Sequence, residues 1–185
     1  MKQTFLTLLV ILAFLACKNE DSEPKLEKTY PGLMDTGFLE GVRAGEYWQS
    51  TAFAEYSIFD STYVGFSCFT YSTGADNREL LTLGEIPLKV GKYPIKGGNA
   101  ISAGLDGFVG AQYGWAEDDG DVFGASYNHD DENSAGYLEV TYVDYVAKRI
   151  LGTFDRMIFK NRLPQSPYPK QVVFEKGKFD MKITQ

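Results

Sequence analysis

Acidic residues between positions 117 and 132 form the group of side chains best suited to chemistry. Seven Asp and Glu residues fall in this stretch, with no Lys or Arg among them. Asp118, Asp119 and Asp121 carry the hard carboxylate oxygens that calcium prefers. A two-residue turn at Asp119-Gly120 would set Asp118 and Asp121 opposite one another, which is destabilising for like charges. We therefore expect either a longer, solvated loop, which the sequence favours, or a calcium ion between these carboxylates.

A second candidate is a pair of aromatic residues just before the acidic stretch. Tyr113 and Trp115 are two positions apart, so on a β-strand their rings project to the same face. If that face meets solvent, the two rings form a platform on which a sugar ring could stack. If it faces inward, both rings belong to the core, the usual place for such side chains. The pair is thus a candidate ligand-binding site with a structural alternative.

His129 is the single histidine of the chain. One histidine excludes a His-cluster metal site and leaves a Ser-His-Asp arrangement dependent on this residue alone. Within "YNHDDEN" we expect it to be a solvated turn residue. The chain has no nucleophile elbow, zinc-protease helix, phosphate loop or dinucleotide fingerprint. We therefore expect no enzyme and no cofactor, although a glycosidase-like pair of carboxylates remains open, because sequence separation does not report distance across a sheet.

The N-terminus carries an apolar run of twelve residues, Phe5 to Ala16, behind one cation, Lys2. A membrane-spanning helix needs about 20 apolar residues, so this layout is typical of a secretory leader that is removed. Ala16-Cys17 resembles the end of a bacterial lipoprotein leader, in which the cysteine after the cleavage site is lipidated. We expect a cleaved leader over 1–16 and a palmitate-bearing Cys17; ordinary secretion and a retained helix are the alternatives.

Residues 17–37 are polar, charged and interrupted by proline and glycine. They show no apolar stripe of helical or strand period, which is typical of a flexible tether. The early acids resemble the short acidic signal that sends Bacteroidota lipoproteins to the outer face of the outer membrane: Glu20, Asp21 and Glu23. The alternative is a solvated linker that happens to be acidic.

Residues 38–185 have the usual length of one domain, and 13 Phe and 12 Tyr in the whole chain supply material for its core. The pattern predicts an all-β domain, a single antiparallel β-sandwich or barrel-like closure. Short aromatic or β-branched runs are separated by turn residues. We predict strands within 47–59, 62–71, 79–86, 107–117, 121–127, 136–146, 149–159 and 170–183.

The last predicted strand changes phase along its length. Apolar residues alternate with polar ones from Phe179 to Ile183, which places one face in the core and one in water. Val172 and Phe174 stand in the opposite phase. We therefore expect a bulge or tight turn near Gly177.

Four short motifs carry a resemblance to a known family: Trp48, "GKYPI" at 91–95, "GYLEVTYVDYVAKRILGTF" at 136–154, and "VVFEKGKF" at 172–179. The domain resembles the small Bacteroidota surface lipoprotein domains of unknown function, which share a G-x-Y strand start, a late G-T-F strand and a closing G-x-F strand. The resemblance implies the cellular location and the fold of the domain, and it implies no activity.

Within these motifs the glycines and phenylalanines have expected structural roles. Gly152 and Gly177 would allow a close backbone approach or a bulge, and Phe154 and Phe179 would fill the core. Cys68, in "YVGFSCFTY", is expected to be a small buried apolar residue. If Cys17 is lipidated, Cys68 is the one remaining thiol and no disulfide forms within the mature chain.

The charge balance argues against nucleic acid as a partner. The formal net charge is −7, and removal of Lys2 with the leader makes it −8; nucleic-acid binding needs a basic surface. Nine Lys and Arg stand against three acids over 148–185. We expect these charges to lie on solvated strand faces; the alternatives are that they complement the acidic loops or face a partner.

We therefore expect a lipid-anchored outer-membrane or cell-surface protein, with the side of the outer membrane left open by the sequence, whose contacts are the membrane and a glycan or protein partner. It would act by binding or as an accessory component, or as an inhibitor of another protein. The alternative is a carboxylate-dependent, carbohydrate-active hydrolase on the cell surface.

Overall fold

The computed structural model describes residues 36–71, 77–97, 107–117, 123–163 and 165–184. Over these residues the protein is all-β, as predicted, and contains ten strands and no helix. Among the same residues, no helix is long and apolar enough to cross a membrane. The strands are β1 (Gly37–Arg43), β2 (Glu46–Tyr56), β3 (Tyr63–Tyr71), β4 (Asn77–Pro87), β5 (Gly91–Gly97), β6 (Val109–Ala116), β7 (Phe123–His129), β8 (Tyr137–Asp144), β9 (Arg149–Asn161) and β10 (Gln171–Thr184).

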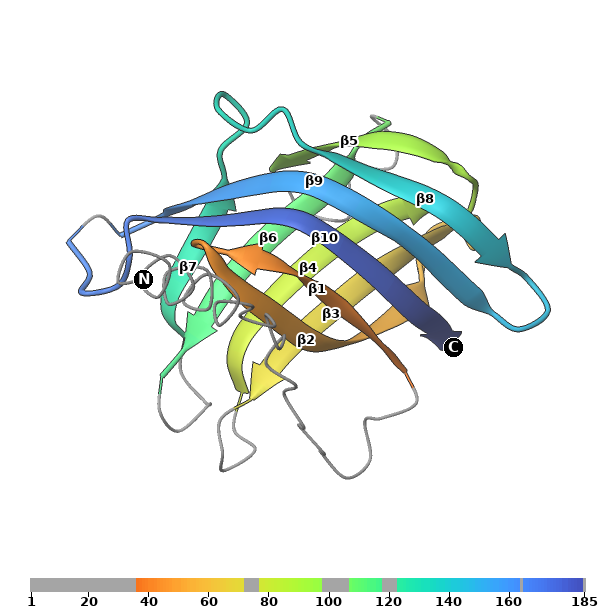
Figure 1. Ribbon diagram of the computed structural model, residues 1–185, viewed down its shortest axis with the longest axis horizontal. Helices are drawn as coiled ribbons and strands as arrows, with labels where there is room; N and C mark the ends of the chain where they lie inside the picture. The colour runs from red at the N-terminus through yellow and green to blue at the C-terminus, as the bar shows by residue number, and fades with distance from the viewer. Residues whose placement is uncertain (1–35, 72–76, 98–106, 118–122, 164, 185) are drawn as a thin grey trace, which may run out of the picture.

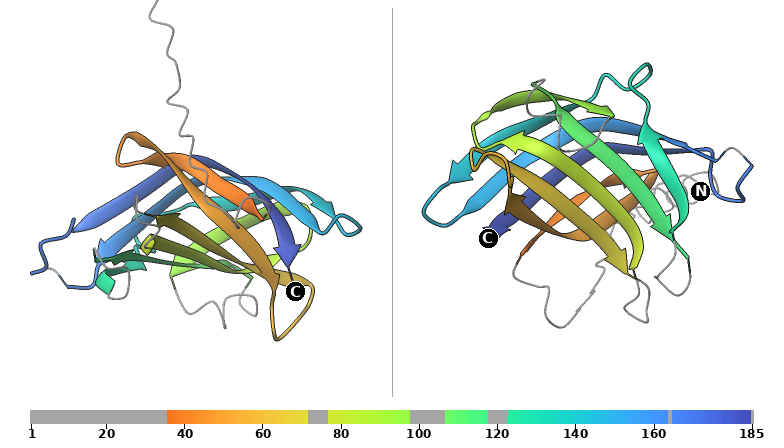
Figure 2. Two further views of the ribbon diagram at one scale, coloured as in Figure 1. Left: turned by 90° about the horizontal axis from the view of Figure 1, so that it is seen from below. Right: turned by 180° about the vertical axis from the view of Figure 1, so that it is seen from behind.

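The strands pair into one sheet that closes on itself (Figures 1 and 2). Antiparallel ladders join β1 to β2, β2 to β3, β3 to β4, β4 to β6 and β6 to β7. The circuit continues from β7 to β9, β9 to β10 and β10 to β1. The domain is therefore barrel-like, one of the two closures that the sequence predicted.

Between β6 and β9 the wall is built from three shorter strands. β7 joins the last part of β6 to the last part of β9. β5 pairs in parallel with the first part of β6, and β8 joins β5 to the first part of β9. One half of this gap is thus closed by β7 and the other half by β5 and β8.

The barrel has two distinct ends. The β1–β2 turn and the β9–β10 connection lie at one end, on the left of Figure 1, which we call the Glu79 end after its buried carboxylate. The β2–β3, β4–β5 and β8–β9 connections lie at the other end, with the C-terminus of β10 and the start of the described chain at Thr36. We call this the Thr36 end.

Aromatic rings fill the interior. At the Glu79 end, Tyr113 is the centre of the packing, with ring centroids 5.1 Å from Tyr127, 5.7 Å from Phe159 and 5.3 Å from Phe174. Trp48 contacts Phe174 edge-on at 4.9 Å. Leu, Ile, Val and Phe side chains from eight of the strands continue one buried cluster. Together, these rings and the aliphatic side chains supply the apolar burial that stabilises the fold.

The predicted phase change in β10 is confirmed. Val172 and Phe174 are buried, as are the alternate residues from Phe179 onward. Between them, Lys176 has a positive φ of 52°, and the register of β10 against β1 shifts by one residue. This bulge turns both halves of the strand towards the same core.

The glycines of the late strands make the close approaches that were expected. A Cβ at Gly152 would collide with the carbonyl oxygen of Glu139 and the ring of Phe179, and one at Gly177 would collide with the ring of Phe154. Both phenylalanines are buried. The two rings therefore occupy the space that side chains at these positions would need.

Candidate functional site

A buried carboxylate lies inside the Glu79 end of the barrel. Glu79 is 4% exposed and projects inward from the start of β4. Its Oε2 accepts hydrogen bonds from Trp48 Nε1 at 2.9 Å and from Thr70 Oγ1 at 2.8 Å. Its Oε1 accepts a bond from the Tyr113 hydroxyl at 2.5 Å and forms an ion pair with Nη1 of Arg43.

These four partners come from β1, β2, β3 and β6, so one side chain joins strands from much of the barrel wall. A carboxylate offers about four lone-pair sites; three of them here accept hydrogen bonds, and Oε1 also faces the Arg43 guanidinium. Most of the acceptor capacity of Glu79 is therefore directed at donors of the core, and little is left for a substrate or a metal ion. The arrangement is that of a buried polar network, which fixes a core.

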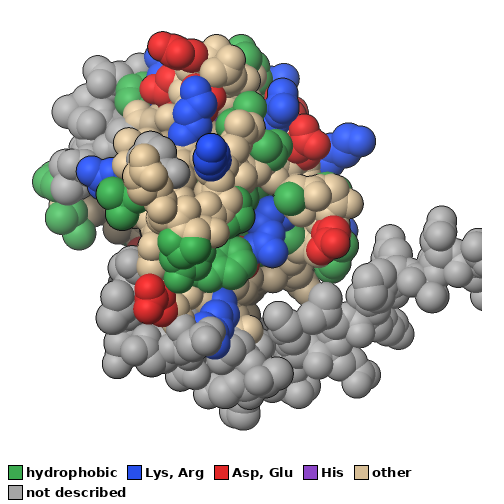
Figure 3. Space-filling model, turned by 90° about the vertical axis from the view of Figure 1, so that its left-hand side faces the viewer, with side chains coloured by type: hydrophobic (Ala, Val, Ile, Leu, Met, Phe, Trp, Pro, Cys, Tyr) green, Lys and Arg blue, Asp and Glu red, His purple; other side chains and the backbone are tan. Residues whose placement is uncertain are grey.

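A layer of larger side chains covers this network. The Arg43 guanidinium carbon lies 5.6 Å from the centroid of the Trp115 ring. Tyr168, from the β9–β10 connection, lies against Trp115 at 6.4 Å, and its hydroxyl is 3.5 Å from a carboxylate oxygen of Glu117. Figure 3 looks onto this end, where Lys and Arg side chains are interspersed with hydrophobic ones.

The two rings proposed from the sequence as ligand-binding residues project to the same, inward face of β6. Tyr113 is 3% exposed and belongs to the core. Burial raises the pKa of its hydroxyl above the ordinary value. Trp115 is half-buried beneath Arg43 and Tyr168. Tyr113 therefore does not supply an exposed platform, and the inward alternative describes this pair.

The acidic residues proposed as calcium ligands, Asp118, Asp119 and Asp121, lie outside the described residues. β6 and β7, which precede and follow these residues in the sequence, form an antiparallel pair. Elsewhere in the described part of the chain, no group of three or more His, Cys, Asp or Glu residues could hold a metal ion.

The expectation for His129 was wrong. His129 ends β7, and its side chain is fully enclosed. Nδ1 lies 2.7 Å from Oδ1 of Asp131, which also accepts a bond from the backbone nitrogen of Gly97 at 2.6 Å. The ring packs edge-on against Phe159 at 5.6 Å. His129 and Asp131 thus join the ends of β7 and β5, a contact between strands that local sequence does not reveal.

Asp130, beside this histidine, links an acidic turn to the basic last third of the chain. Its carboxylate pairs with Lys160 Nζ at 2.8 Å and accepts a bond from Asn133 Nδ2 at 2.8 Å. The hydrogen bond from Lys160, followed by that from Asn133, lowers the pKa of Asp130 below its ordinary value. This ion pair is one contact between the acidic stretch 117–132 and the basic residues of 148–185.

Cys68 is completely buried in β3, as predicted. Burial raises the pKa of its thiol well above the ordinary range. A thiol held neutral inside the core is a poor nucleophile, so Cys68 has the packing role expected of it.

One set of aromatic side chains lies outside the core and was not singled out from the sequence. Phe53 on β2 and Phe69 and Tyr71 on β3 project from the outer wall, opposite in phase to the buried residues of the same strands. Phe53 and Phe69 have centroids 5.8 Å apart with 18° between their planes, and Phe69 and Tyr71 are 6.2 Å apart at 27°. We call these three half-buried rings the aromatic strip.

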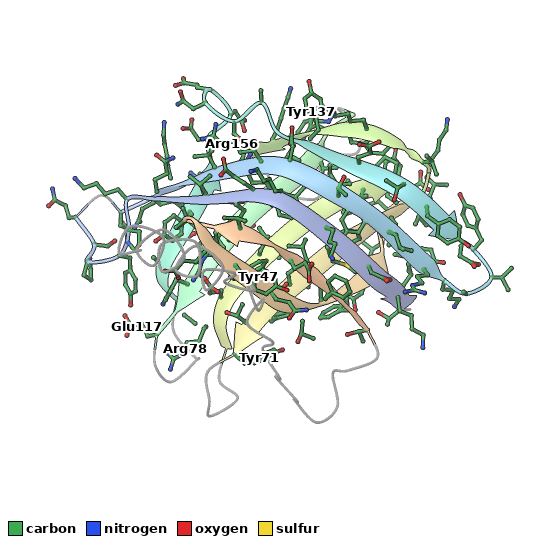
Figure 4. The ribbon with its side chains drawn as sticks, in the orientation of Figure 1. Tyr47, Tyr71, Arg78, Glu117, Tyr137 and Arg156 are labelled. Atoms are coloured by element: carbon green, nitrogen blue, oxygen red, sulfur yellow. The ribbon has the colours of Figure 1, made fainter. Side chains whose placement is uncertain are left out.

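The aromatic strip has polar side chains and one further apolar one beside it. In the β2–β3 register, Thr51 faces Phe69 and Ser67 faces Phe53, and Leu80 of β4 stands opposite Phe69 on its other side. Figure 4 places Tyr71 and Arg78 towards the Glu79 end, and Tyr137 and Arg156 on the other side of the barrel. The outer wall of β2 and β3 thus carries three nearly parallel, half-buried rings, with the hydroxyl-bearing residues Thr51 and Ser67 as their neighbours in the ladder.

Comparison of the chain with known protein families, with curated proteins and with solved structures finds no match.

Proposed function

We propose that this protein is an exported lipoprotein, anchored to the outer membrane through Cys17, that binds a glycan without chemistry along the aromatic strip. The alignment of Phe53, Phe69 and Tyr71 on the outer wall is the observation that carries the binding role. The anchor rests on the leader and the position of Cys17 in the sequence.

The strip matches the chemistry of a sugar chain. A sugar ring has an apolar face of C–H groups, which packs on an aromatic face, and hydroxyl groups at its edge, which need hydrogen-bond partners. Nearly parallel rings about 6 Å apart offer successive stacking positions along one direction. The hydroxyl groups of Thr51 and Ser67 lie on the same face of the sheet.

The hydrolase alternative has weaker support. The enclosed carboxylate of Glu79 already accepts hydrogen bonds from Trp48, Thr70 and Tyr113, and it forms an ion pair with Arg43. A glycosidase needs two carboxyl groups that flank the scissile bond and are free to act on it. A binding role requires no such pair.

Affinity electrophoresis of the full chain in gels containing defined soluble polysaccharides would test the proposal. We expect retardation by at least one polysaccharide, and a loss of affinity of roughly three- to tenfold for each ring removed in Phe53→Ala and Phe69→Ala. Tyr142→Ala is the matched control, because Tyr142 is exposed on β8, away from the strip.

Equal retardation of the strip variants and the wild-type protein would refute the role of the strip. Release of reducing ends by the wild-type protein, abolished in Glu79→Gln, would favour the hydrolase instead. Thermal unfolding of each variant shows whether a loss of binding reflects a loss of folding.

A further inference from the structure

Exposed apolar side chains gather at the Thr36 end of the barrel. Nine large hydrophobic residues are exposed in the described part of the chain, and five of them lie in three connections at this end. Val146 and Ile58 are the most exposed of all, at 96% and 91%. We call these five residues the apolar crown: Ile58, Phe59, Val90, Tyr145 and Val146.

The three connections that carry the crown are bonded to one another. The backbone nitrogen of Leu88 donates to the carbonyl oxygen of Thr62 at 2.8 Å. The Tyr145 hydroxyl donates to the carbonyl oxygen of Leu88 at 2.5 Å. The β2–β3, β4–β5 and β8–β9 connections are thus linked to one another, and they lie at the right-hand side of Figure 1.

Local hydrogen bonds hold the exposed tips in place. The Asp144 carboxylate accepts bonds from the backbone nitrogens of Val146 at 2.9 Å and Ala147 at 2.7 Å. In the β2–β3 connection, Asp60 accepts bonds from the backbone nitrogen and the hydroxyl of Thr62, both at 2.8 Å. Such side-chain-to-backbone turns preorganise a loop. These bonds therefore hold the turns in a conformation that exposes the apolar side chains of the crown to water.

The described chain starts beside this crown. The carbonyl oxygen of Thr36 accepts a bond from the backbone nitrogen of Lys182 at 2.7 Å, and the next residue, Ile183, donates to the carbonyl oxygen of Lys148 at 2.7 Å. Residues that precede Thr36, including Cys17, therefore connect to the barrel next to the β8–β9 connection. From Cys17 to Asp35 there are 19 residues, which at full extension span at most about 60 Å.

We propose that the apolar crown rests in the lipid bilayer to which Cys17 anchors the protein. This inference depends on the lipid anchor of the proposed function and adds the orientation of the barrel. An anchor on a short chain keeps the crown at a high effective concentration near the bilayer, so even a weak apolar contact is populated. The Glu79 end then points away from the membrane, and the aromatic strip lies along the side of the barrel.

Besides the Asp60 and Asp144 carboxylates that its turns hold, the Thr36 end carries tyrosines and lysines. A depression of about 610 Å³ lies at the same end; the crown residue Tyr145 lines it together with Tyr56, Tyr63, Lys89 and residues of the β2–β3 and β4–β5 connections. Tyrosines and lysines are typical of the headgroup region, where rings with polar tips meet both phases. Lys89 and Lys182 are exposed nearby and attract anionic headgroups. The apolar tips would enter the acyl boundary while this depression faces the headgroups.

Site-specific fluorescence of the anchored full-length protein tests this orientation. Val146→Cys is labelled with an environment-sensitive dye, and Leu163→Cys, exposed in the β9–β10 connection, is the matched control at the opposite end. The buried Cys68 does not compete for the label. The lipidated protein is reconstituted at low density in vesicles of phosphatidylethanolamine and phosphatidylglycerol. We expect the emission of the dye at position 146 to be blue-shifted relative to that at position 163. A water-soluble quencher should quench the dye at position 146 about tenfold more slowly than the dye at position 163.

The same label in Ile58→Ser/Phe59→Ser/Val90→Ser should lose most of this protection. Equal quenching at positions 146 and 163 in a chain whose mass shows acyl groups on Cys17 would overturn the inference and leave the anchor intact. A Cys17 without lipid would refute the anchor itself. Protection that grows with protein density would indicate a second copy, and protection seen in native membranes but not in pure lipid would indicate a protein partner; either result overturns the inference.

Discussion

Replacement of Glu79 with glutamine tests whether this buried carboxylate supports the barrel or performs chemistry. Glutamine keeps the volume of the side chain but has one acceptor oxygen where the carboxylate has two. Four donors converge on the site, from Arg43, Trp48, Thr70 and Tyr113. In Glu79→Gln the amide group therefore faces donors, and Arg43 loses its counter-ion.

The magnitude follows from the burial of the two charges. Removal of one partner of a buried ion pair costs about 3–5 kcal/mol. The Arg43 side chain is 27% exposed and keeps some hydration, so we expect a loss of about 2–4 kcal/mol in the free energy of unfolding. For a domain of this size, that corresponds to a fall in Tm of about 5–15 °C.

Urea unfolding followed by tryptophan fluorescence measures this loss, and Trp48 reports on the site itself because its indole nitrogen bonds Glu79. Glu117→Gln is the control: Glu117 is exposed at the same end, and we expect a change within about 0.5 kcal/mol. Removal of Arg43 as well, in Glu79→Gln/Arg43→Met, should recover part of the loss. Unchanged or increased stability of Glu79→Gln would refute this reasoning, since relief of strain at an active site is the usual signature of a catalytic carboxylate.

Three further predictions concern stability and reactivity. Gly152→Ala should lose roughly 1–3 kcal/mol or more of unfolding free energy in urea titrations, because its Cβ would meet the carbonyl oxygen of Glu139; Gly65→Ala, whose nearest atom is 3.8 Å away, should change little, and a similar loss in both would contradict the packing argument. Cys68 should react with a thiol reagent in the unfolded chain and not in the native protein, because burial keeps the thiol neutral; rapid native labelling would place it at the surface. The lowered pKa of Asp130 stabilises the fold above the unfolded-state value near about pH 4, and that contribution is lost as pH falls through the lower folded value. Stability of Asp130→Asn should therefore decline less than that of the wild-type protein as the pH is lowered below about 4, and parallel curves would show that the pair with Lys160 has no effect.

The all-β fold could be predicted because alternation of apolar and polar residues is a local property. The phase change between Phe174 and Phe179 predicted the β10 bulge, since both halves must face one core. β1 was missed. Two residues interrupt the alternation of apolar and polar residues in β1. Gly41 packs against the backbone of β10, and the charged side chain of Arg43 points towards the interior, where it pairs with Glu79.

The candidate sites were harder to predict because they depend on which strands become neighbours. The polar neighbours of His129 in the sequence predict a solvated turn residue, yet β7 pairs it with Phe159 of β9 and places it next to Gly97 at the end of β5. The aromatic strip joins residues of β2 and β3 that are diagonal neighbours across the ladder. Its signal in the sequence was the presence of aromatic residues at both phases of "YVGFSCFTY", which indicates a strand with rings on each face.

The lipid anchor on Cys17 is the central claim of this account, because it determines the location of the protein and the meaning of the apolar crown. Intact mass measurement of the membrane-extracted protein tests it most directly, alongside a Cys17→Ser variant. We expect a mature chain that begins at Cys17 and carries two or three acyl chains, and a Cys17→Ser chain that bears no lipid and leaves the membrane fraction. An unmodified Cys17 in the membrane-extracted protein, or a Cys17→Ser chain that keeps its acyl groups, would contradict the claim.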